Sequence, residues 1–510
     1  MLKLSAAFFL CHIILSCFLV NQIDSLSFFD QRPFSINSRK SRKLIRKEHG
    51  GLPEADKLTV EEKQSYIKDA FIFSWDGYRN HSWGFDENRP VSNDPRNTRN
   101  GWGATIVDSL DTLYIMGLRK EFDEAKEFVR NINWTLAEEP VQLFETVIRY
   151  VGGLLSAYDL SNDLVFVEKA VELTELLIPA FDSPTGVPYQ YMDFKTGKPL
   201  RSPIACLAEV GTIQIEFTRL SEITGNWKYH RIGQRVYDAF LKMNDTRGLY
   251  PHLINVNTGK PASDRYTWGG MGDSFYEYLI KQLVVVKGKD QTKFKLVKEI
   301  IDGLEARLLV DSAVDPSLSF LVEINDGQPS YRMDELACFA PAALILAARH
   351  FPDDFGHIES AANRLLNGCY SAWDSTMTGL APEVFTWDMK PRFFYEHKPS
   401  VVPVVKSYIL RPETLESLYY FYVYTKNPVY QDMAWDIFNS LYTYCRANSG
   451  YTGLYNVDDI EYPWDDREES FFFAETLKYL YLIFEDPHHP RFPFDQWVFN
   501  TEAHPLKIKN

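Results

Sequence analysis

Helix-like segments that each carry an acidic residue recur along this chain, and they constrain its fold more than any other feature. In residues 141–158 the apolar side chains fall on one arc at helical spacing, while Glu145 and Arg149 share the opposite stripe. Acidic residues return in later helix-like segments, roughly sixty to eighty residues apart. They are Glu209, Asp273, Asp334, Glu335, Glu413, Glu416 and Glu475. This spacing is about the length of one helix–loop–helix unit, so it predicts a ring of helical hairpins.

A ring of this kind packs its inner helices against one another and against an outer layer of helices. A polar stripe on an inner helix then points to the centre, so carboxylates from distant parts of the chain converge there. Alone, each carboxylate is typical of a surface ion pair or an ordinary helix start. A chain of 510 residues that is 45% hydrophobic and 15% aromatic can bury a core of this size, and its aromatic rings offer flat surfaces for sugars.

The net charge of −15 argues against a nucleic-acid partner, because phosphate binding requires clustered lysine and arginine. An acidic balance is compatible with a carbohydrate site or a calcium site. The sequence contains no HExxH, GxSxG, P-loop, EF-hand or CxxC motif, so no other chemistry is indicated. Paired carboxylates are the usual means of cleaving a glycosidic bond, because one protonates the leaving oxygen while the other activates water or attacks.

The stretch LRPETLES contains a carboxylate suited to act as a base. Pro412 favours the first helical position, which puts Glu413 in the first turn. The positive end of the helix dipole and the neighbouring Arg411 both favour the ionised form of Glu413. An ionised carboxylate accepts a proton, so we expect Glu413 to act as the base.

Residues 4–20 form an apolar run that could meet a membrane. No small-residue cleavage pattern follows the run, so we favour an uncleaved signal anchor in residues 1–26 over a cleaved signal peptide. We expect the polar, basic residues 27–55 to form a stem. Residues 56–510 would then be the catalytic domain, inside the secretory pathway.

Glycosylation signals and cysteine spacing are compatible with an oxidising compartment. Three Asn-X-Ser/Thr sequons are potential glycosylation sites, at Asn80, Asn133 and Asn244. Cys338 and Cys369 would close a loop of about thirty residues, which suits a disulfide. Cys206 and Cys445 could equally be buried free thiols.

Several longer motifs, read in order, resemble the class I α-1,2-mannosidases, glycoside hydrolase family 47. They include FSWDGYRNHSWGFDENRP, DSLDTLYIMGL, FETVIRYVGGLLSAYDLS, AEVGTIQIEFTRLSEITGN, GDSFYEYLIKQ, LRPETLESLYYFY, ESFFFAETLKYLYLIFED and FNTEAHPL. The resemblance covers about residues 65 to 506. It implies an all-α (αα)7 barrel of helical hairpins that a C-terminal segment plugs. It also implies hydrolysis of terminal α-1,2-linked mannose from high-mannose N-glycans, with inversion and a bound Ca2+. The expected protein is a monomer in the endoplasmic reticulum or Golgi membrane, with its catalytic domain in the lumen.

The resemblance implies roles for single residues. Glu145 matches the proposed general acid of the family, and Asp273 and Glu413 match the two candidates for activating water. Thr501 in NTEAHP matches the direct calcium ligand, which binds through its hydroxyl and carbonyl oxygens. The residues that match the mannose-binding end are Arg149, Glu209, Arg411, Glu416, Phe471, Glu475 and Glu502.

Two positions depart from the family pattern, and one cysteine pair agrees with it. Glu335 stands where the family commonly has histidine, which affects a sugar contact. Met271 stands where enzymes of the endoplasmic reticulum carry arginine, which suggests the broader trimming of Golgi-type members. Cys338 and Cys369 match the family's disulfide.

Two other functions compete with the hydrolase. A quality-control lectin of the same fold would bind mannose glycans with little hydrolysis. The presence of the acid, both water-activating candidates and the calcium-binding threonine favours the enzyme over this lectin. A helical-repeat scaffold for protein partners would have a solvated inner face and would leave the NTEAHPL motif without a role.

Overall fold

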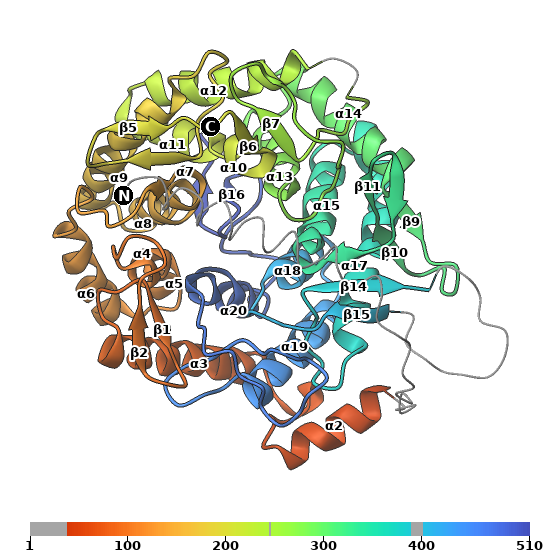
Figure 1. Ribbon diagram of the computed structural model, residues 1–510. Coiled ribbons are helices and arrows are strands. Elements are labelled where there is room, and N and C mark those ends of the chain that lie inside the picture. Colours follow the sequence, from red (N-terminus) through yellow and green to blue (C-terminus); the bar gives the residue numbers. More distant parts are fainter. Residues whose placement is uncertain (1–37, 244–245, 389–400, 510) are drawn as a thin grey trace, which may run out of the picture. The chain divides into compact units, whose positions relative to one another are not determined.

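The computed structural model describes residues 38–243, 246–388 and 401–509, which form two concentric layers of helices (Figure 1). Within these residues the outer helices are α3 (Val60–His81), α6 (Arg119–Arg130), α9 (Leu164–Leu177), α12 (Lys228–Leu241), α14 (Gln291–Arg307), α17 (Glu359–Asp374) and α19 (Val429–Tyr444). The inner segments are α4 (Ala104–Asp108) with α5 (Leu110–Ile115), α7 (Leu143–Glu145) with α8 (Gly152–Ser161), α10 (Leu207–Gly211) with α11 (Gln214–Thr224), α13 (Asp273–Val285), α15 (Ala340–His350), α18 (Glu413–Thr425) and α20 (Leu477–Leu482). Seven outer helices thus pair with seven inner segments, which confirms the expected all-α (αα)7 barrel.

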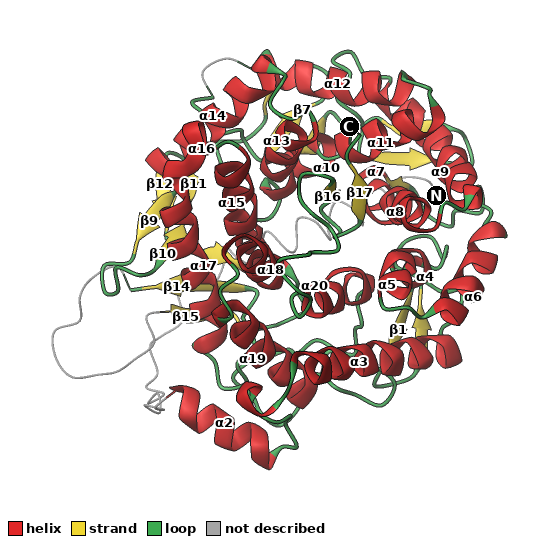
Figure 2. Ribbon diagram, turned by 180° about the vertical axis from the view of Figure 1, so that it is seen from behind, coloured by secondary structure: helices red, strands yellow, loops and turns green. Residues whose placement is uncertain are grey.

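The two layers differ in burial because they differ in their number of neighbours. The outer helix α6 buries one stripe, formed by Phe122, Ala125 and Val129, and leaves the rest of its surface polar. The inner helix α13 is buried from Ser274 to Val284, because inner helices and outer helices surround it. Ring closure follows from contacts between the first inner segment and the last, where α5 meets the helical turn that precedes α20. Figure 2 shows this inner ring from the opposite side.

Short antiparallel strands connect the helical layers. The paired strands are β1 (Glu87–Arg89) with β2 (Asp94–Arg96), β9 (Leu309–Asp311) with β10 (Ser319–Leu321), and β11 (Glu323–Asn325) with β12 (Gln328–Ser330). The three-stranded sheets are β3 (Val141–Gln142), β4 (Tyr191–Asp193) and β5 (Lys198–Leu200); β6 (Ile204–Cys206), β7 (Leu253–Asn255) and β8 (Lys260–Pro261); and β13 (Met333–Asp334), β14 (Val384–Trp387) and β15 (Val401–Val405). Strands β3, β6 and β13 each run directly into an inner helical segment, so the sheets fix where those segments begin.

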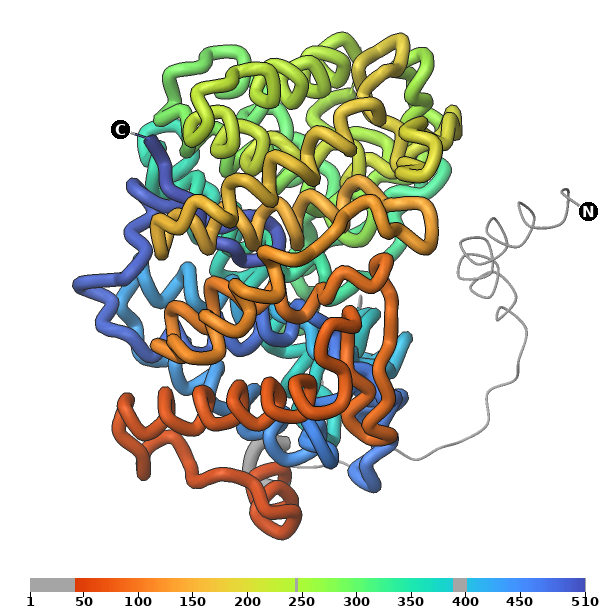
Figure 3. Tube along the Cα trace, turned by 90° about the vertical axis from the view of Figure 1, so that its left-hand side faces the viewer, coloured from red at the N-terminus to blue at the C-terminus, as the bar shows by residue number. Residues whose placement is uncertain are grey.

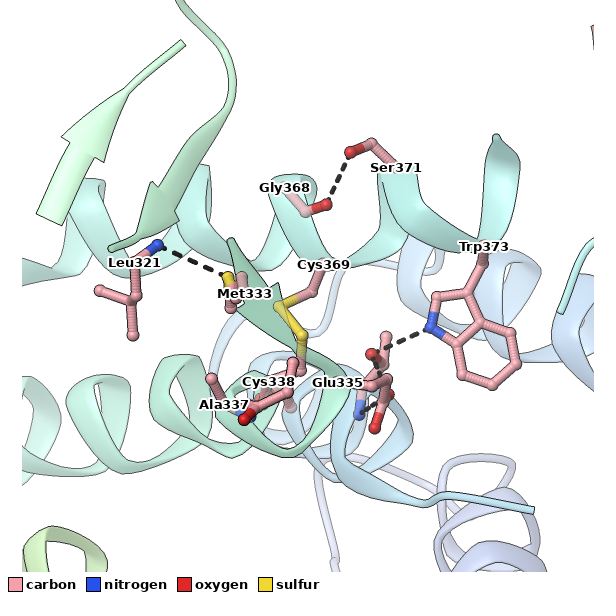
Figure 4. Close-up of a disulfide and its surroundings, with 12 residues drawn as sticks. Leu321, Met333, Glu335, Ala337, Cys338, Gly368, Cys369, Ser371 and Trp373 are labelled. Atoms are coloured by element: carbon pink, nitrogen blue, oxygen red, sulfur yellow. Dashed lines mark hydrogen bonds between the residues drawn. A yellow bond between two sulfur atoms is a disulfide. The ribbon is translucent and has the colours of Figure 1, made fainter. Parts of the chain in front are cut away.

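A disulfide joins the inner and outer layers. Cys338 lies on η4 (Glu335–Phe339), the helical turn that leads into α15, and Cys369 lies on α17. Their Cα atoms are 5.8 Å apart and their sulfur atoms are bonded, which confirms the expected pair (Figure 4). Cys206 and Cys445 are buried free thiols, so the alternative that the sequence left open is the correct one for them.

A helix is present before residue 56, within residues 27–55 that we expected to form a stem. Helix α2 (Ser38–Glu48) packs on α19, although it lies within the expected stem. The guanidinium groups of Arg42 and Arg46 are buried and pair with Asp374 and Asp436, which explains why this basic segment docks. The expected signal anchor, residues 1–26, lies outside the described residues. Of the helices that are described, none has the length and apolar character needed to cross a membrane.

The C-terminal hairpin, β16 (Trp497–Phe499) and β17 (Pro505–Lys507), enters the ring from one end (Figures 1 and 3). Buried ion pairs hold it there. Lys478 on α20 donates to Asp111 at 2.9 Å and to the carbonyl of Ala503 at 2.7 Å. His504 contacts Asp111 at 2.8 Å and Asp108 at 3.3 Å. These contacts confirm that a C-terminal segment plugs the barrel.

Lys478→Met should lower the free energy of unfolding by about 3–5 kcal/mol, because it leaves Asp111 buried without its lysine partner. Chemical denaturation of the variant measures this loss. The control is Lys295→Met, since Lys295 is exposed and lies 3.7 Å from Glu299 in a surface pair. That control should change the free energy of unfolding by less than about 0.5 kcal/mol. Equal effects of the two substitutions would contradict the role of Lys478.

Candidate active site

Five acidic residues lie within the first three positions of inner helical segments. Glu145 ends the short α7, Glu209 is in α10, and Glu335 begins η4. Asp273 is the first residue of α13 and Glu413 is the first residue of α18. The prediction that Glu413 lies in a first helical turn is therefore confirmed. Each inner segment follows an outer helix in the chain, so the inner segments run in the same direction. Their N-terminal ends, and the carboxylates on them, therefore lie at the same end of the ring.

Charge–charge interactions link these carboxylates into one group. Asp273 interacts with Glu413, and Glu413 interacts with Glu475. Glu475 interacts with Glu502, and Glu502 in turn with Glu145. This series of charge–charge interactions starts on α13 and ends on α7, so residues more than three hundred positions apart share one site. Sequence spacing alone predicted this convergence.

Two arginines surround Glu145. Its carboxylate accepts hydrogen bonds from Arg149 Nε at 2.6 Å and from Arg99 Nε at 3.2 Å. Burial by itself raises the pKa of Glu145, but the charges of Arg149 and Arg99 outweigh burial and lower the pKa to about 2. Glu145 is therefore ionised at neutral pH. Arg99 also binds Glu87 at 2.8 Å, so the loop after β2 contributes to the site.

Arg149 connects Glu145 to the C-terminal hairpin and to an aromatic ring. Its Nη1 pairs with Glu502 and lies 3.3 Å from Asp108. The guanidinium group also lies over the ring of Phe471, 5.8 Å from its centre. Arg149 thus joins Glu145 on α7, Asp108 on α4 and Glu502 on the C-terminal hairpin.

Two π-helical turns interrupt the inner helices at the site. One, Thr146–Val151, contains Arg149 and joins α7 to α8. The other, Phe472–Thr476, contains Glu475 and leads into α20. A π turn adds a residue to the helical turn and so redirects the side chains on it, and such turns are frequent at functional sites. Here each turn presents a charged residue of the site.

The opposite part of the site is short of cations. Burial raises the pKa of Asp273 to about 8, and the charges of Asp334, Glu277 and Glu413 add to this effect. These surroundings favour the protonated form of Asp273. Arg411 pairs with Glu383 at 2.8 Å, and its Nη1 lies 3.7 Å from Glu413 Oε1. Glu145 and Asp273 thus occupy opposite electrostatic environments within one site.

Helix α13 carries a polar stripe that sequence reading could have found. Asp273, Glu277 and Lys281 lie four residues apart on one face of a buried helix. Lys281 pairs with Glu277 and lies 3.3 Å from Glu416 on α18. Burial raises the pKa of Glu416 to about 8 in spite of Lys281. Lys281 thus links α13, the helix that carries Asp273, to α18.

Thr501 lies at the tip of the C-terminal hairpin, in the turn between β16 and β17. Its backbone N–H donates to Tyr278 Oη at 3.3 Å, and Tyr278 donates to Glu216 Oε1 at 2.5 Å. Asn500 Nδ2 donates to the same Glu216 oxygen at 2.9 Å. Contacts of the tip reach inner segments of five of the seven hairpins, through α4 with α5, the π turn before α8, α11, α13 and α20.

The surroundings of Thr501 fit a divalent cation. Glu216 Oε2 is buried and has no hydrogen-bond partner in the described structure. Burial raises the pKa values of Glu475 and Glu502 well above the usual range, and their mutual charge raises that of Glu475 further. A cation relieves this repulsion. Across residues 38–243, 246–388 and 401–509, no three His, Cys, Asp or Glu side chains form a metal-binding group, and the candidate ligand atoms are the hydroxyl and carbonyl oxygens of Thr501.

Three non-glycine residues with positive φ flank the functional positions. Met271 (φ 77°) precedes Asp273 by two residues, and Leu410 (φ 71°) directly precedes Arg411. Ala503 (φ 56°) directly follows Glu502. Side chains rarely adopt this backbone region, and strain of this kind clusters at functional sites. Met271, which the sequence analysis connected with substrate specificity, is one of these residues.

The remaining expected residues lie as follows. Glu209 accepts a hydrogen bond from Gln190, and burial raises the pKa of Glu209 to about 7. Asn80 and Asn133 are exposed, as glycosylation requires, and Asn244 lies outside the described residues. Sequence reading missed Arg99, Glu87, Glu216, Glu277 and Lys281. Only the stripe on α13 offered a sequence signal, because the other partners come from loops or distant helices.

Comparison with known proteins gives a consistent result. The profile of glycosyl hydrolase family 47 matches residues 70–508. The mannosyl-oligosaccharide 1,2-alpha-mannosidase MNS1 of Arabidopsis thaliana is 38% identical over 494 residues, which are 93% of this chain and 86% of that protein. The endoplasmic reticulum mannosyl-oligosaccharide 1,2-alpha-mannosidase of Rattus norvegicus is 40% identical over 460 residues, covering 88% and 68%. The mannosyl-oligosaccharide 1,2-alpha-mannosidase IB of Homo sapiens is 37% identical over 470 residues, covering 90% and 72%.

A solved structure agrees with the fold. The alpha-1,2-mannosidase from Trichoderma reesei superposes with a TM-score of 0.81 at 31% sequence identity. The superposition covers 88% of this chain and 99% of that chain. The two concentric layers of helices are therefore shared over nearly the whole of that enzyme.

The protonated state of Asp273 predicts a pH-dependent gain in stability for Asp273→Asn. An unfolded aspartate loses its proton near about pH 4, whereas the pKa of folded Asp273 is about 8. Between these values the folded state binds the extra proton, so the free energy of unfolding of the wild type falls as pH rises. The variant lacks this loss, so its stability relative to the wild type should increase from about pH 5 to about pH 8.

Denaturation in the presence of a chelator measures this difference without a contribution from bound cations. Asp432→Asn is the control, because Asp432 is exposed on α19. Its stability relative to the wild type should be the same at both pH values. A constant difference for Asp273→Asn as well would show that Asp273 is ionised in the folded protein.

Proposed function

This chain belongs to glycosyl hydrolase family 47, and on that premise we propose that it is a mannosyl-oligosaccharide 1,2-α-mannosidase. Its substrates are terminal α-1,2-linked mannose residues of high-mannose N-glycans. The observation that carries this proposal is the convergence of Glu145, Asp273 and Glu413 from three inner helices onto one site. Two or more carboxyl groups around one point are what glycosidic hydrolysis needs.

We assign the general base to Glu413. Its position at the start of α18 places it at the positive end of the helix dipole, and Arg411 lies beside it. Both interactions favour a carboxylate that can take a proton from water.

The proton for the leaving oxygen has two possible sources. The family resemblance assigns it to Glu145, and this assignment remains a prediction. Because Arg149 and Arg99 hold the pKa of Glu145 at about 2, Glu145 can donate a proton only if substrate weakens these ion pairs. Asp273 already holds a proton, since burial raises its pKa to about 8. Either route leaves Glu413 as the group that activates water.

The substrate-binding groups surround these carboxyl groups. Phe471 offers a ring face next to Arg149, and a sugar ring can stack on such a face. Arg149, Arg411, Glu209, Glu416, Glu475 and Glu502 supply donors and acceptors for sugar hydroxyls. We propose that water-mediated contacts of Glu475 and Glu502 also balance the charge of a bound ion.

We propose that Thr501 binds Ca2+ through its hydroxyl and carbonyl oxygens. Hard oxygen atoms of this kind are the ligands that calcium prefers. When bound, Ca2+ would supply positive charge to the buried carboxylates and sites for sugar hydroxyls. The hairpin holds Thr501 in place through Tyr278, Asn500 and the buried pairs of His504.

We further propose that the reaction inverts the anomeric carbon and takes place in the lumen of the endoplasmic reticulum or Golgi. Inversion needs a base that activates water rather than one that attacks the sugar. A glycan-binding lectin of the same fold is the alternative. It would not require the base that Glu413 provides.

Glu413→Gln should lower kcat about 10²- to 10⁴-fold with little effect on glycan binding, because the amide fits the site but cannot take a proton. Mannose released from a nine-mannose N-glycan measures kcat, and calorimetry measures binding. Nuclear magnetic resonance of the first product should show β-mannose if the reaction inverts. Normal turnover by the variant would exclude Glu413 as the base, and binding without release by the wild type would favour the lectin.

Thr501→Ala should abolish the thermal stabilisation that Ca2+ gives, because the ligand hydroxyl is lost. The melting temperature of each protein is measured in calcium and in chelator. Thr501→Ser is the matched control, because it keeps both oxygen ligands and should keep the calcium-dependent shift. A melting temperature of the wild type that is the same in both conditions would contradict the calcium site.

A further inference from the structure

Glu335 occupies a fixed and fully enclosed position next to the proposed base. It is 1% exposed and is the first residue of η4, directly after β13. Its backbone N–H donates to the carbonyl of Glu383 at 3.0 Å. Figure 4 shows Glu335 near the Cys338–Cys369 disulfide and on the same side of α17 as the indole of Trp373. The disulfide therefore ties the turn that carries Glu335 to the outer layer.

The direction of the hydrogen bonds around Glu335 is determined by Trp373. The indole nitrogen of Trp373 can only donate, and it donates to Thr414 Oγ1 at 3.0 Å. The single hydroxyl hydrogen of Thr414 is then directed to Glu335 Oε1, at 2.7 Å. The backbone N–H of Thr414 also donates to Oε1, at 3.3 Å. Oε1 is therefore an acceptor, and a proton on Glu335 resides on Oε2.

The other oxygen of Glu335 is available to the carboxyl group of Glu413, the residue directly before Thr414. Both the charge of Glu413 and a side-chain hydrogen bond with it act on Glu335. Glu335 Oε2 and Glu413 Oε2 are both buried, and neither has a donor among the described residues. Two ionised carboxylates in this arrangement would face each other with lone pairs only. One proton between them satisfies both groups.

We propose that Glu335 and Glu413 form a carboxyl–carboxylate pair in which Glu335 carries the proton and donates it as a hydrogen bond to ionised Glu413. Glu335 is then a positioning residue, because it acts on the reaction through Glu413. It orients the carboxylate and keeps it ionised, while Glu413 accepts the proton of water. This inference rests on the proposed role of Glu413 as the base.

The charged groups around Glu335 are compatible with a pair that holds one proton. Arg411 and Glu383 come from neighbouring loops, and Asp334 comes from β13. Glu413 and Glu416 come from α18, and Asp273 from α13 faces Glu413. The contacts of η4 with α17 bring the neutral indole and the disulfide, and α15 begins with the apolar Ala340–Ala343. One arginine among several carboxyl groups favours a single negative charge on the pair.

The protonation behaviour agrees with this geometry. Burial raises the pKa of Glu335 well above its usual range, and the charge of Glu413 raises it further. The raised pKa of Glu335 favours the singly charged form of the pair, which is the form in which Glu413 can act as base.

The first test is the dependence of kcat/KM on pH in three proteins. Glu335→Gln keeps a hydrogen-bond donor toward Glu413, so it should keep the acidic limb of the wild-type profile and kcat within about tenfold. Glu335→Ala removes the donor, so the acidic limb should move to higher pH by about one unit. Glu359→Gln is the control at the start of α17, where half-buried Glu359 pairs with Arg349, and it should not change the profile.

The second test observes the proton directly and does not depend on catalysis. Infrared spectra of the full-length wild type minus Glu335→Gln at neutral pH should show the carbonyl band of one protonated carboxyl group. The same subtraction for Glu359→Gln should show a carboxylate band. A carboxylate band for Glu335, or an unmoved acidic limb in a folded Glu335→Ala protein, would overturn the pair. Absence of mannose release by the wild type would instead refute the proposed function, while the infrared result would still decide the protonation of Glu335.

Discussion

The burial of many carboxyl groups among few cations is the constraint on which this structure depends. Arg149 holds Glu145, Glu502 and Asp108, and Lys281 holds Glu277 and Glu416. Each cation joins inner helices or the C-terminal hairpin that are far apart in the sequence. Removing one partner of such a group leaves an uncompensated buried charge, which is strongly unfavourable. The ring is therefore held by its apolar core, but the arrangement at its centre is determined by these ion pairs.

The same scarcity of cations divides the site into two environments. On the side of α7, two arginines face one carboxylate, and Glu145 is ionised. On the side of α13 and α18 the carboxyl groups outnumber their cations, and protons remain on some of them. Hydrolysis of a glycoside requires a group that gives a proton and a group that takes one. The arrangement of charge favours ionised carboxyl groups in one part of the site and protonated carboxyl groups in another at the same pH.

Sequence patterns predicted the fold because both of its determinants are periodic. Apolar residues at helical spacing indicated the helices, and the recurring carboxylates indicated hairpins around a common centre. The pair Glu145 and Arg149 was predictable since it lies four residues apart on one helix, and Glu413 was predictable from Pro412. Contacts between distant segments were not predictable. Arg99 reaches Glu145 from a loop, and the docking of α2 depends on carboxylates of α17 and α19 that no local pattern indicates.

The hairpin that carries Thr501 and Glu502 has a consequence for biosynthesis. Ribosomes make β16 and β17 after every one of the fourteen helical segments of the ring, and domains generally fold as they emerge. A nascent chain can therefore pack its apolar layers while Asp111, Lys478 and Arg149 still lack their hairpin partners. A chain that ends just before residue 497 would contain nearly all of the apolar core but would lack Thr501, Glu502 and the ion pairs of His504. Correct assembly of the site therefore depends on complete synthesis of the hairpin.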